Sequence, residues 1–133
     1  MHYGEIIGLI GLGLGAAMGL GALFAPDWAA GVVRLKPDPV KPGGYSEFRA
    51  TYGGLLLLVH LSAFVILLHA PSAMGLAAAL PLAAGWFGAA LGRTVSMVLD
   101  RGKGGEAKII PIWMGTEIAL GLAIAAPILQ FIG

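Results

Sequence analysis

The residues in this sequence that could do chemistry are ionisable side chains set inside long apolar stretches. Arg93 and Glu117 each lie within such a stretch, and His60 lies near the middle of a third. If the stretches cross a bilayer, each charge there costs on the order of 2.5 to 3.5 kcal/mol, so it should face neighbouring helices and find a partner. Counted from the polar ends, Arg93 and Glu117 reach a similar depth of ~8–10 Å, because a helix rises about 1.5 Å per residue. We therefore expect them to form an ion pair.

Two helical stripes would bring further polar groups to the same depth. Arg49 and His60 are spaced to share one face of a helix, with Tyr52 beside them, and Arg93 shares a face with Asp100. If both stripes point inward, they line one polar pocket that opens toward the cytoplasm. The residues of this candidate ligand-binding pocket are Glu47, Arg49, Tyr52, His60, Arg93, Ser96, Asp100, Trp113 and Glu117.

These polar residues have two interpretations. In the first, Arg49 and Arg93 pair with acids only to satisfy buried charge and to fix the order of the helices. The acids available to them are Glu47, Asp100 and Glu117. In the second, the guanidinium groups and the Tyr52 hydroxyl receive an anionic or polar head group, with apolar walls for a tail. His60 could relay protons, or it could be a neutral histidine hydrogen-bonded to a neighbouring helix.

The sequence indicates no catalytic residue, metal site or cofactor. It lacks a Gly-rich phosphate loop, a nucleophile elbow and a His-Glu-x-x-His pair, and it has no cysteine. Only His60 lies deep, so a haem held by paired histidines is not supported. His2, Glu5 and His69 lie toward the span ends without metal-ligand spacing. The sequence leaves open the possibility of an enzyme that uses the buried acids or His60 as acid and base on a lipid-like substrate.

Composition places all of these residues in a membrane protein. Of 133 residues, 58% are hydrophobic and 11% are charged, and the mean hydropathy is +0.88, which excludes a water-soluble fold. The formal net charge of +1 gives no indication of a nucleic-acid partner. A crossing needs about 20 apolar residues. The spans we expect are Gly4 to Ala25, Ala50 to His69, Ala73 to Leu99 and Ile109 to Ile132.

The distribution of positive charge predicts the orientation of these spans. All eight Lys and Arg residues lie in or beside the first and third connections, namely Arg34, Lys36, Lys41, Arg49, Arg93, Arg101, Lys103 and Lys108. Both connections of a four-span protein lie on one side, so the positive-inside rule places them in the cytoplasm and both termini outside. No basic residue precedes the first span, which we therefore expect to be retained rather than cleaved as a signal. We predict an all-α, integral membrane four-helix bundle with antiparallel up-down topology, a single domain over residues 1–133.

Glycine spacing predicts how the helices pack. Glycines follow one side of the first span at intervals that allow close approach of another backbone. They are Gly4, Gly8, Gly11, Gly15 and Gly19. The same reasoning extends to glycines of the third and fourth spans, namely Gly85, Gly88, Gly92, Gly115 and Gly121. The alternative is that these glycine faces receive a ligand or a second copy of the protein.

The long cytoplasmic connection, residues 26–46, contains three prolines after Pro26. Trp28 and the apolar residues after it could form a short interfacial helix with Arg34 and Lys36 at the head groups, as an anchor or as a lid. Ser46 is expected to cap the second span, with Glu47 in its first turn. A short turn around Pro71 should join spans two and three as antiparallel neighbours. Pro81 and Pro127 lie inside spans, where kinks are tolerated.

At the same polar positions the chain resembles a family of small bacterial four-span membrane proteins, the domain of unknown function 4345. The resemblance covers most of the chain and rests on the start of span two, the end of span three and one acid in span four. The residues that carry it are Glu47, Arg49, Tyr52, Gly53, Gly54, Gly92, Arg93, Ser96, Asp100, Gly102 and Glu117. It implies a multi-pass bundle in the bacterial inner membrane with these charges as a recurring polar core, and it implies no particular activity.

We predict an accessory or small-molecule- or lipid-binding membrane protein without a cofactor. Its expected partners are membrane lipids, together with further copies of itself or a larger membrane complex, and no nucleic acid. The alternative is a small transporter or lipid carrier that uses Arg49, Arg93 and Glu117, and a membrane enzyme is the third reading. The one-sided charge weakens any analogy with small multidrug transporters that insert in both orientations.

Overall fold

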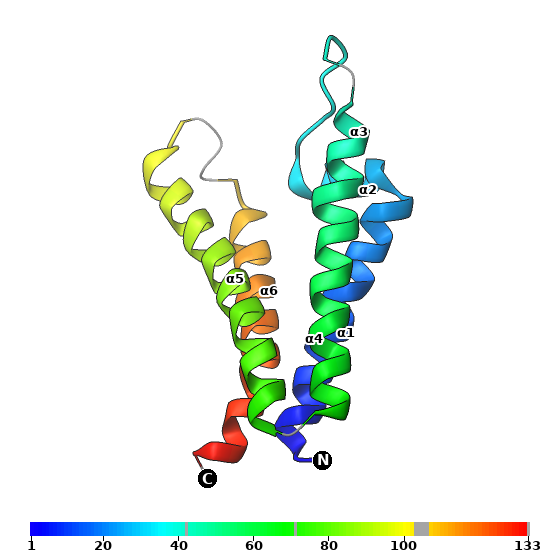
Figure 1. Ribbon diagram of the computed structural model, residues 1–133. Coiled ribbons are helices and arrows are strands. Elements are labelled where there is room, and N and C mark those ends of the chain that lie inside the picture. Colours follow the sequence, from blue (N-terminus) through cyan, green and yellow to red (C-terminus); the bar gives the residue numbers. More distant parts are fainter. Residues whose placement is uncertain (42, 71, 103–106, 133) are drawn as a thin grey trace. The chain divides into compact units, whose positions relative to one another are not determined.

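A computed structural model describes residues 1–41, 43–70, 72–102 and 107–132 of the chain, and all regular elements among them are helical (Figure 1). This confirms the all-α class. The elements are α1 (Tyr3–Phe24), α2 (Pro26–Val33), α3 (Gly44–Glu47), the π-helix η1 (Phe48–Leu55), α4 (Leu56–His69), α5 (Ser72–Leu99), α6 (Ile110–Ala125) and the 3₁₀-helix η2 (Ala126–Phe131). Of the residues used in the sequence analysis, Pro42, Pro71 and Lys103 lie outside the described residues.

Four helical stretches are long and apolar enough to cross a membrane, as expected from the sequence. They are Tyr3–Phe24, Gly44–His69, Ala73–Leu99 and Ile110–Phe131. Large apolar side chains such as Ile10, Leu58 and Leu91 are exposed on them, which suits helices that face lipid. A helix satisfies its own backbone hydrogen bonds, so these stretches can lie in lipid at little cost.

The second apolar helix begins earlier than predicted, and its capping residue was predicted wrongly. The backbone enters helix at Gly44, after Gly43 with φ 108°, and the N–H of Glu47 donates to the carbonyl of Gly43 at 3.2 Å. Ser46 therefore lies inside the first turn and does not cap it. A positive φ favours glycine, so Gly43 supplies the chain reversal at the helix start that the sequence reading assigned to a serine side chain. Glu47 does lie in the first turn, as predicted.

The contacts divide the chain into two units, which are described separately. The connection unit is Leu12–Val65, and the hairpin unit joins Met1–Gly11 with Ile66–Gly133. The single-domain interpretation, the up-down topology of the whole bundle and the location of the termini stay predictions.

In the connection unit, α1 packs closely against η1 and α4. A Cβ added to Gly15 would collide with the His60 ring, and one added to Gly19 would collide with the backbone of Leu57. Farther along the pair, a Cβ at Gly53 would lie 2.8 Å from Cα of Leu23. Residues later in α1 contact residues earlier in the second helix, so the two helices run antiparallel. Glycines supply this close approach, as predicted for the first span.

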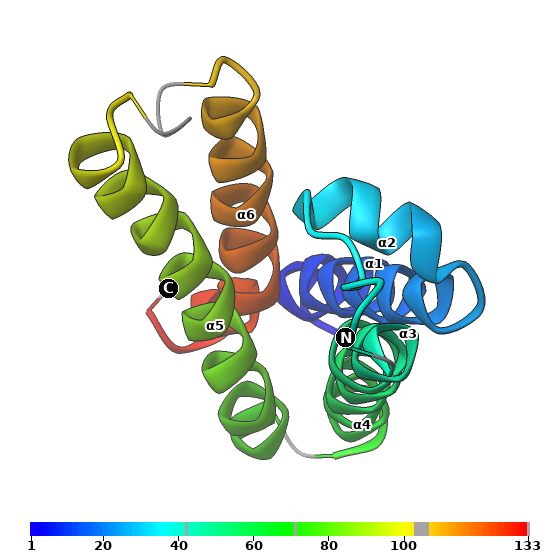
Figure 2. The same ribbon diagram turned by 90° about the horizontal axis from the view of Figure 1, so that it is seen from above.

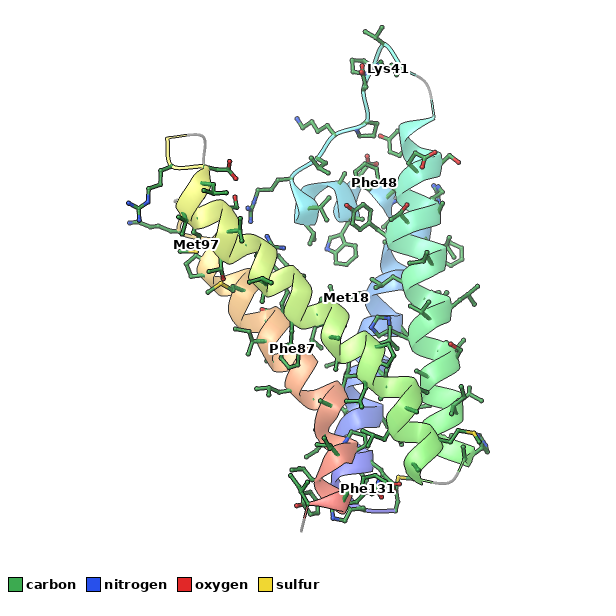
Figure 3. All side chains as sticks on the ribbon, turned by 60° about the vertical axis from the view of Figure 1, so that its left-hand side comes forward. Met18, Lys41, Phe48, Phe87, Met97 and Phe131 are labelled. Carbon is green, nitrogen blue, oxygen red and sulfur yellow. The ribbon has the colours of Figure 1, made fainter. Side chains whose placement is uncertain are left out.

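In the hairpin unit, α5 and α6 lie side by side and antiparallel (Figure 2). Phe87 of α5 packs over Gly121 of α6, where an added Cβ would lie 2.7 Å from the ring. The start of α1 packs near the end of α6 through the predicted glycines: a Cβ on Gly8 would lie 2.7 Å from Cγ of Pro127, and one on Gly11 would lie 2.9 Å from Cγ1 of Ile124. Figure 3 shows Phe87 on the α5–α6 pair.

Close glycine packing at the other glycines of spans three and four is not seen among the described residues and stays a prediction. No described atom lies within 4 Å of a Cβ built at Gly85, Gly88, Gly92 or Gly115. The i, i+3, i+7 spacing gives α5 a smooth small-residue face, but spacing alone cannot say whether another helix covers it.

The two prolines inside spans act differently. Pro81 is accommodated within α5. Pro127 lies at the start of η2, where the α-helix tightens to 3₁₀ geometry. Proline lacks the N–H for an α-helical bond, which accounts for the change of helix type at the end of the fourth span.

Candidate functional site

Arg93 on α5 and Glu117 on α6 form the ion pair predicted from their depth. Nε of Arg93 donates to Oε1 of Glu117 at 2.7 Å, and the side chains are 30% and 7% exposed. Antiparallel packing of α5 on α6 brings the two residues to the same level. A second contact supports this register: Oγ1 of Thr94, the residue after Arg93, donates to Sδ of Met114 at 3.3 Å. Met114 lies one turn before Glu117. Oε2 of Glu117 is buried and has no hydrogen-bond partner among the described residues.

Ser96 lies one turn after Arg93 near the end of α5, Asp100 directly follows that helix, and Trp113 lies one turn before Glu117 on α6. Oγ of Ser96 donates to Oδ2 of Asp100 at 2.8 Å. Asp100 is thus engaged by a serine, and the structure records no ion pair between it and Arg93. Trp113, on α6, is half-buried.

Arg49, Tyr52 and Glu47 lie near the start of the second apolar helix. Nη1 of Arg49 donates to the carbonyl of Leu23 near the end of α1. The Tyr52 ring packs on Phe48 with 5.5 Å between ring centroids. Glu47 is exposed, and no described residue forms an ion pair with it. The guanidinium of Arg49 therefore joins α1 to η1 through a backbone carbonyl rather than through an acid.

His60 is buried, with 1% of its surface exposed, and its ring covers Gly15. Nδ1 lies 2.8 Å from the carbonyl oxygen of Leu56, one turn back on α4, and donates to it in the tautomer that carries a proton there. Glycine at position 15 provides the space for this ring. The contacts favour the interpretation of His60 as a packed, hydrogen-bonded histidine of the helix pair.

The predicted site residues thus fall into two groups, one in each unit. The hairpin unit holds Arg93, Ser96, Asp100, Trp113 and Glu117, and the connection unit holds Glu47, Arg49, Tyr52 and His60. Most of these polar side chains are engaged by neighbours in their own unit, which favours the structural interpretation of each group. The single pocket that joins both groups stays a prediction.

A groove that the sequence analysis did not identify lies within the connection unit. It has a volume of about 750 Å³ and runs between α2 and the first connection. Its lining residues are Asp27, Ala30, Gly31, Arg34, Leu35, Lys36, Pro37, Asp38, Pro39, Lys41, Gly43, Gly44 and Tyr45. Figure 1 shows the connection leaving α2 and returning to α3, and Figure 3 places Lys41 near its tip.

α2 is held by a small apolar cluster. Ala29 and Ala30 pack with Ala22 of α1 and with Phe48 of η1, and Val33 joins the edge of this cluster. The helix predicted between Trp28 and Lys36 therefore exists, as Pro26–Val33. Its small residues allow it to lie close to the two longer helices.

Two short contacts join segments that line the groove. The Tyr45 hydroxyl donates to Oδ1 of Asp27 at 2.7 Å, which ties α3 to the start of α2. A Cβ on Gly44 would lie 2.7 Å from Cβ of Pro37, so the connection lies directly against the start of α3. These contacts join segments far apart in the sequence, so no local pattern indicates them.

The groove carries three basic side chains, Arg34, Lys36 and Lys41, all exposed. None of them forms an ion pair with a residue that the structure describes. Both acids of the groove are engaged locally: Asp27 accepts from Tyr45, and Oδ1 of Asp38 accepts from the N–H of Val40 at 2.8 Å. The basic groups are therefore the ones free to meet a ligand.

Within the described ranges, no group of three or more His, Asp or Glu side chains is placed to hold a metal ion. Comparison of the chain with protein-family models, with curated proteins and with solved structures finds no match.

Proposed function

We propose that this protein is a multi-pass membrane protein that binds a lipid or another small amphiphile with a polar head, at the groove of the first connection. The observation that carries the proposal is the groove itself, whose volume of about 750 Å³ falls in the range of ligand sites. Its lining mixes basic side chains with apolar ones such as Leu35 and Ala30. It includes Gly44 and Tyr45, the first residues of the stretch Gly44–His69, which is apolar enough to span a membrane.

This binding site differs from the polar pocket that was predicted from the depth of charged residues in the spans. Arg93 is paired with Glu117, Ser96 with Asp100, and Arg49 with a backbone carbonyl. In the proposal, the Arg93–Glu117 pair and the bond of Arg49 to Leu23 join helices, whereas Ser96 and Asp100 are engaged within one stretch of chain. Breaking a buried ion pair leaves an uncompensated charge. Membership of the family of domain of unknown function 4345 is part of the same proposal, as are a bacterial inner-membrane location and a cytoplasmic first connection.

Filling the groove tests the proposal. Gly31 lines the groove, and no described atom lies within 4 Å of a Cβ built there, so Gly31→Trp places a large ring in or over the groove without a backbone clash. Native mass spectrometry of gently solubilised, full-length protein should detect a bound lipid or amphiphile in the wild type and much less in this variant. Gly88→Trp is the matched control, because Gly88 is equally open but lies on α5. Equal ligand content in all three proteins would overturn the proposal.

A proton-coupled transporter is the second candidate, and one observation favours it. Oε2 of Glu117 is buried without a hydrogen-bond partner among the described residues, so protonation there would leave the bond of Oε1 to Arg93 in place. Proteoliposomes under an imposed proton gradient should then take up a fluorescent amphiphile with the wild type and not with Glu117→Gln. Equal uptake by the two proteins, or no uptake by either, would remove this candidate.

A further inference from the structure

The groove has the charge expected of a site for an anion. Its lining contains three basic side chains and two acids, and the acids already accept local hydrogen bonds. The basic groups come from three positions spread along the connection, Arg34, Lys36 and Lys41, so they approach the groove from different points of the chain. An anion in the groove could pair with these basic side chains without breaking an ion pair, because none of them forms one with a described residue.

Arg34 occupies a backbone position that usually belongs to glycine. α2 ends in a Schellman motif: the N–H of Leu35 donates to the carbonyl of Ala30 at 3.1 Å, and the N–H of Arg34 donates to that of Gly31 at 3.3 Å. Arg34 is the left-handed residue of this motif, with φ 57° and ψ 30°, and the only described non-glycine residue with positive φ. An L-residue in this conformation is strained, and such strain is often found at ligand sites. The arginine side chain at this position therefore suggests a use beyond ending the helix.

We propose that the groove binds the phosphate of an anionic phospholipid, with Arg34 as the principal ligand and Lys36 and Lys41 as supporting cations. A guanidinium group presents a planar fork of N–H donors that matches two phosphate oxygens, while each ammonium group acts as a point charge. This inference rests on the proposed function and names its ligand class.

The surroundings of α2 favour a lipid over free phosphate. The groove contacts one side of α2 through Asp27, Ala30 and Gly31. Another side of the helix borders a small apolar hollow of about 50 Å³, lined by Trp28, Val32 and Val33 among others. Trp28 is half-exposed, and tryptophan is enriched where a membrane meets water. The hollow is also lined by Met18 of α1 and Leu56 of α4, so the apolar side of α2 rests on two helices that are apolar enough to span a membrane, while its other side borders the basic groove.

Competition between two phospholipids tests the inference. Full-length protein is placed in nanodiscs of phosphatidylcholine with a minor share of phosphatidylglycerol, and native mass spectrometry measures which lipid stays bound. We expect phosphatidylglycerol to be enriched on the wild type over its share of the bilayer. Each basic residue near an anionic membrane surface strengthens binding by about fivefold, so Arg34→Gln with Lys36→Gln and Lys41→Gln should abolish the enrichment.

The controls separate the possible outcomes. Arg101→Gln removes a positive charge from the third connection and should keep the enrichment, while size-exclusion elution and circular dichroism verify that each variant is folded. If wild type and triple variant show the same enrichment, the inference is overturned.

Binding of both lipids without preference would also overturn the inference, but it would leave the proposed function in place. The absence of any bound lipid would overturn both. Loss of bound phosphatidylglycerol on addition of inorganic phosphate supports the phosphate site, whereas binding of phosphate without binding of lipid contradicts the lipid source.

Discussion

At the scale of single residues, the ion pair of Arg93 with Glu117 indicates that these two charges within the apolar helices have a structural role. The bond of 2.7 Å joins two helices, and Glu117 is nearly enclosed. A buried pair is a weak source of net stability, but removal of one partner leaves the other charge without compensation. The pair should therefore behave as a unit that fixes α5 against α6.

Loss of one partner should cost more than loss of both. Arg93→Ala is expected to lower the free energy of unfolding by about 2–3 kcal/mol, because it leaves the buried carboxylate of Glu117 unpaired. Arg93→Ala combined with Glu117→Ala should recover most of that loss, which a double-mutant cycle of denaturant unfolding in detergent measures. Purely additive losses would contradict the role of the pair as a staple.

Gly15 offers a second test at this scale. An added methyl group would meet the buried ring of His60, so Gly15→Ala should lower stability by about 1–3 kcal/mol through overpacking. Gly13→Ala is the matched control on the same helix, because its Cβ would lie at 3.8 Å from Phe64, an ordinary contact. It should be neutral or stabilising, since alanine is the better helix former. Thermal unfolding of both variants measures the difference, and equal behaviour would count against close packing of α1 on α4.

At the scale of elements, α2 and the apolar cluster beneath it support one wall of the groove. Phe48 is 7% exposed and packs with Ala22, Ala29 and Ala30 (Figure 3). This is the largest side chain of the cluster, and small residues surround it on α1 and α2. The position of α2, and with it the side of the groove formed by Asp27, Ala30 and Gly31, depends on this one ring.

Phe48→Ala should release α2 without unfolding the spanning helices. Truncation of a buried phenylalanine costs roughly 3 kcal/mol, and here the loss falls on a small local cluster. Trypsin should then cut faster after Arg34, as mass spectrometry of the fragments would reveal; Lys36 and Lys41 are each followed by proline, which blocks cleavage there. Phe24→Ala provides the control, because Phe24 is 74% exposed and its loss should leave the cleavage rate unchanged. Equal cleavage rates for Phe48→Ala and the wild type would contradict the role of the cluster.

The elements show which parts of the fold the sequence could predict. Hydropathy located the four apolar helices, because a span needs about 20 apolar residues whatever its neighbours are. The close packing of the α1 glycines was predicted correctly. The same spacing on α5 stays a prediction, since a small-residue face needs a partner that spacing does not identify. The start of the second span was also misjudged, because the positive φ of Gly43 follows from the path of the connection.

At the scale of the whole molecule, the charges of the connections predict on which side of the membrane the groove lies. Arg34, Lys36 and Lys41 line the groove and are also part of the charge that the positive-inside rule counts. The groove should therefore face the cytoplasm, where the leaflet carries anionic lipid.

The absence of cysteine makes this orientation easy to test. In spheroplasts, a membrane-impermeant maleimide should label Ile132→Cys directly and Val40→Cys only after permeabilisation. Both positions are well exposed, at 71% and 85%, so accessibility in the folded chain does not limit the reaction. Labelling of Val40→Cys in intact spheroplasts would place the groove outside and contradict the assignment.

The site was less predictable than the fold. The pairing of Arg93 with Glu117 followed from the cost of charge in lipid. The groove could not be predicted in this way, because its shape depends on contacts between segments of the connection. These are the Schellman motif at Arg34, the contact of Gly44 with Pro37 and the hydrogen bond of Tyr45 to Asp27. The one available signal was the placement of basic residues between prolines in the long connection, from which we predicted the orientation and an interfacial helix with Arg34 and Lys36 at the head groups, but no groove.

Arg34→Gly tests the central claim most directly, because it separates binding from folding. Glycine adopts the left-handed conformation freely, so the substitution should raise stability by about 1 kcal/mol while removing the guanidinium. Native mass spectrometry of this variant in mixed phosphatidylcholine and phosphatidylglycerol nanodiscs should find phosphatidylglycerol occupancy lowered about fivefold beside an unchanged or higher melting temperature. Occupancy equal to that of the wild type would mean that Arg34 serves only to end α2, and that the groove is not a site for anionic lipid.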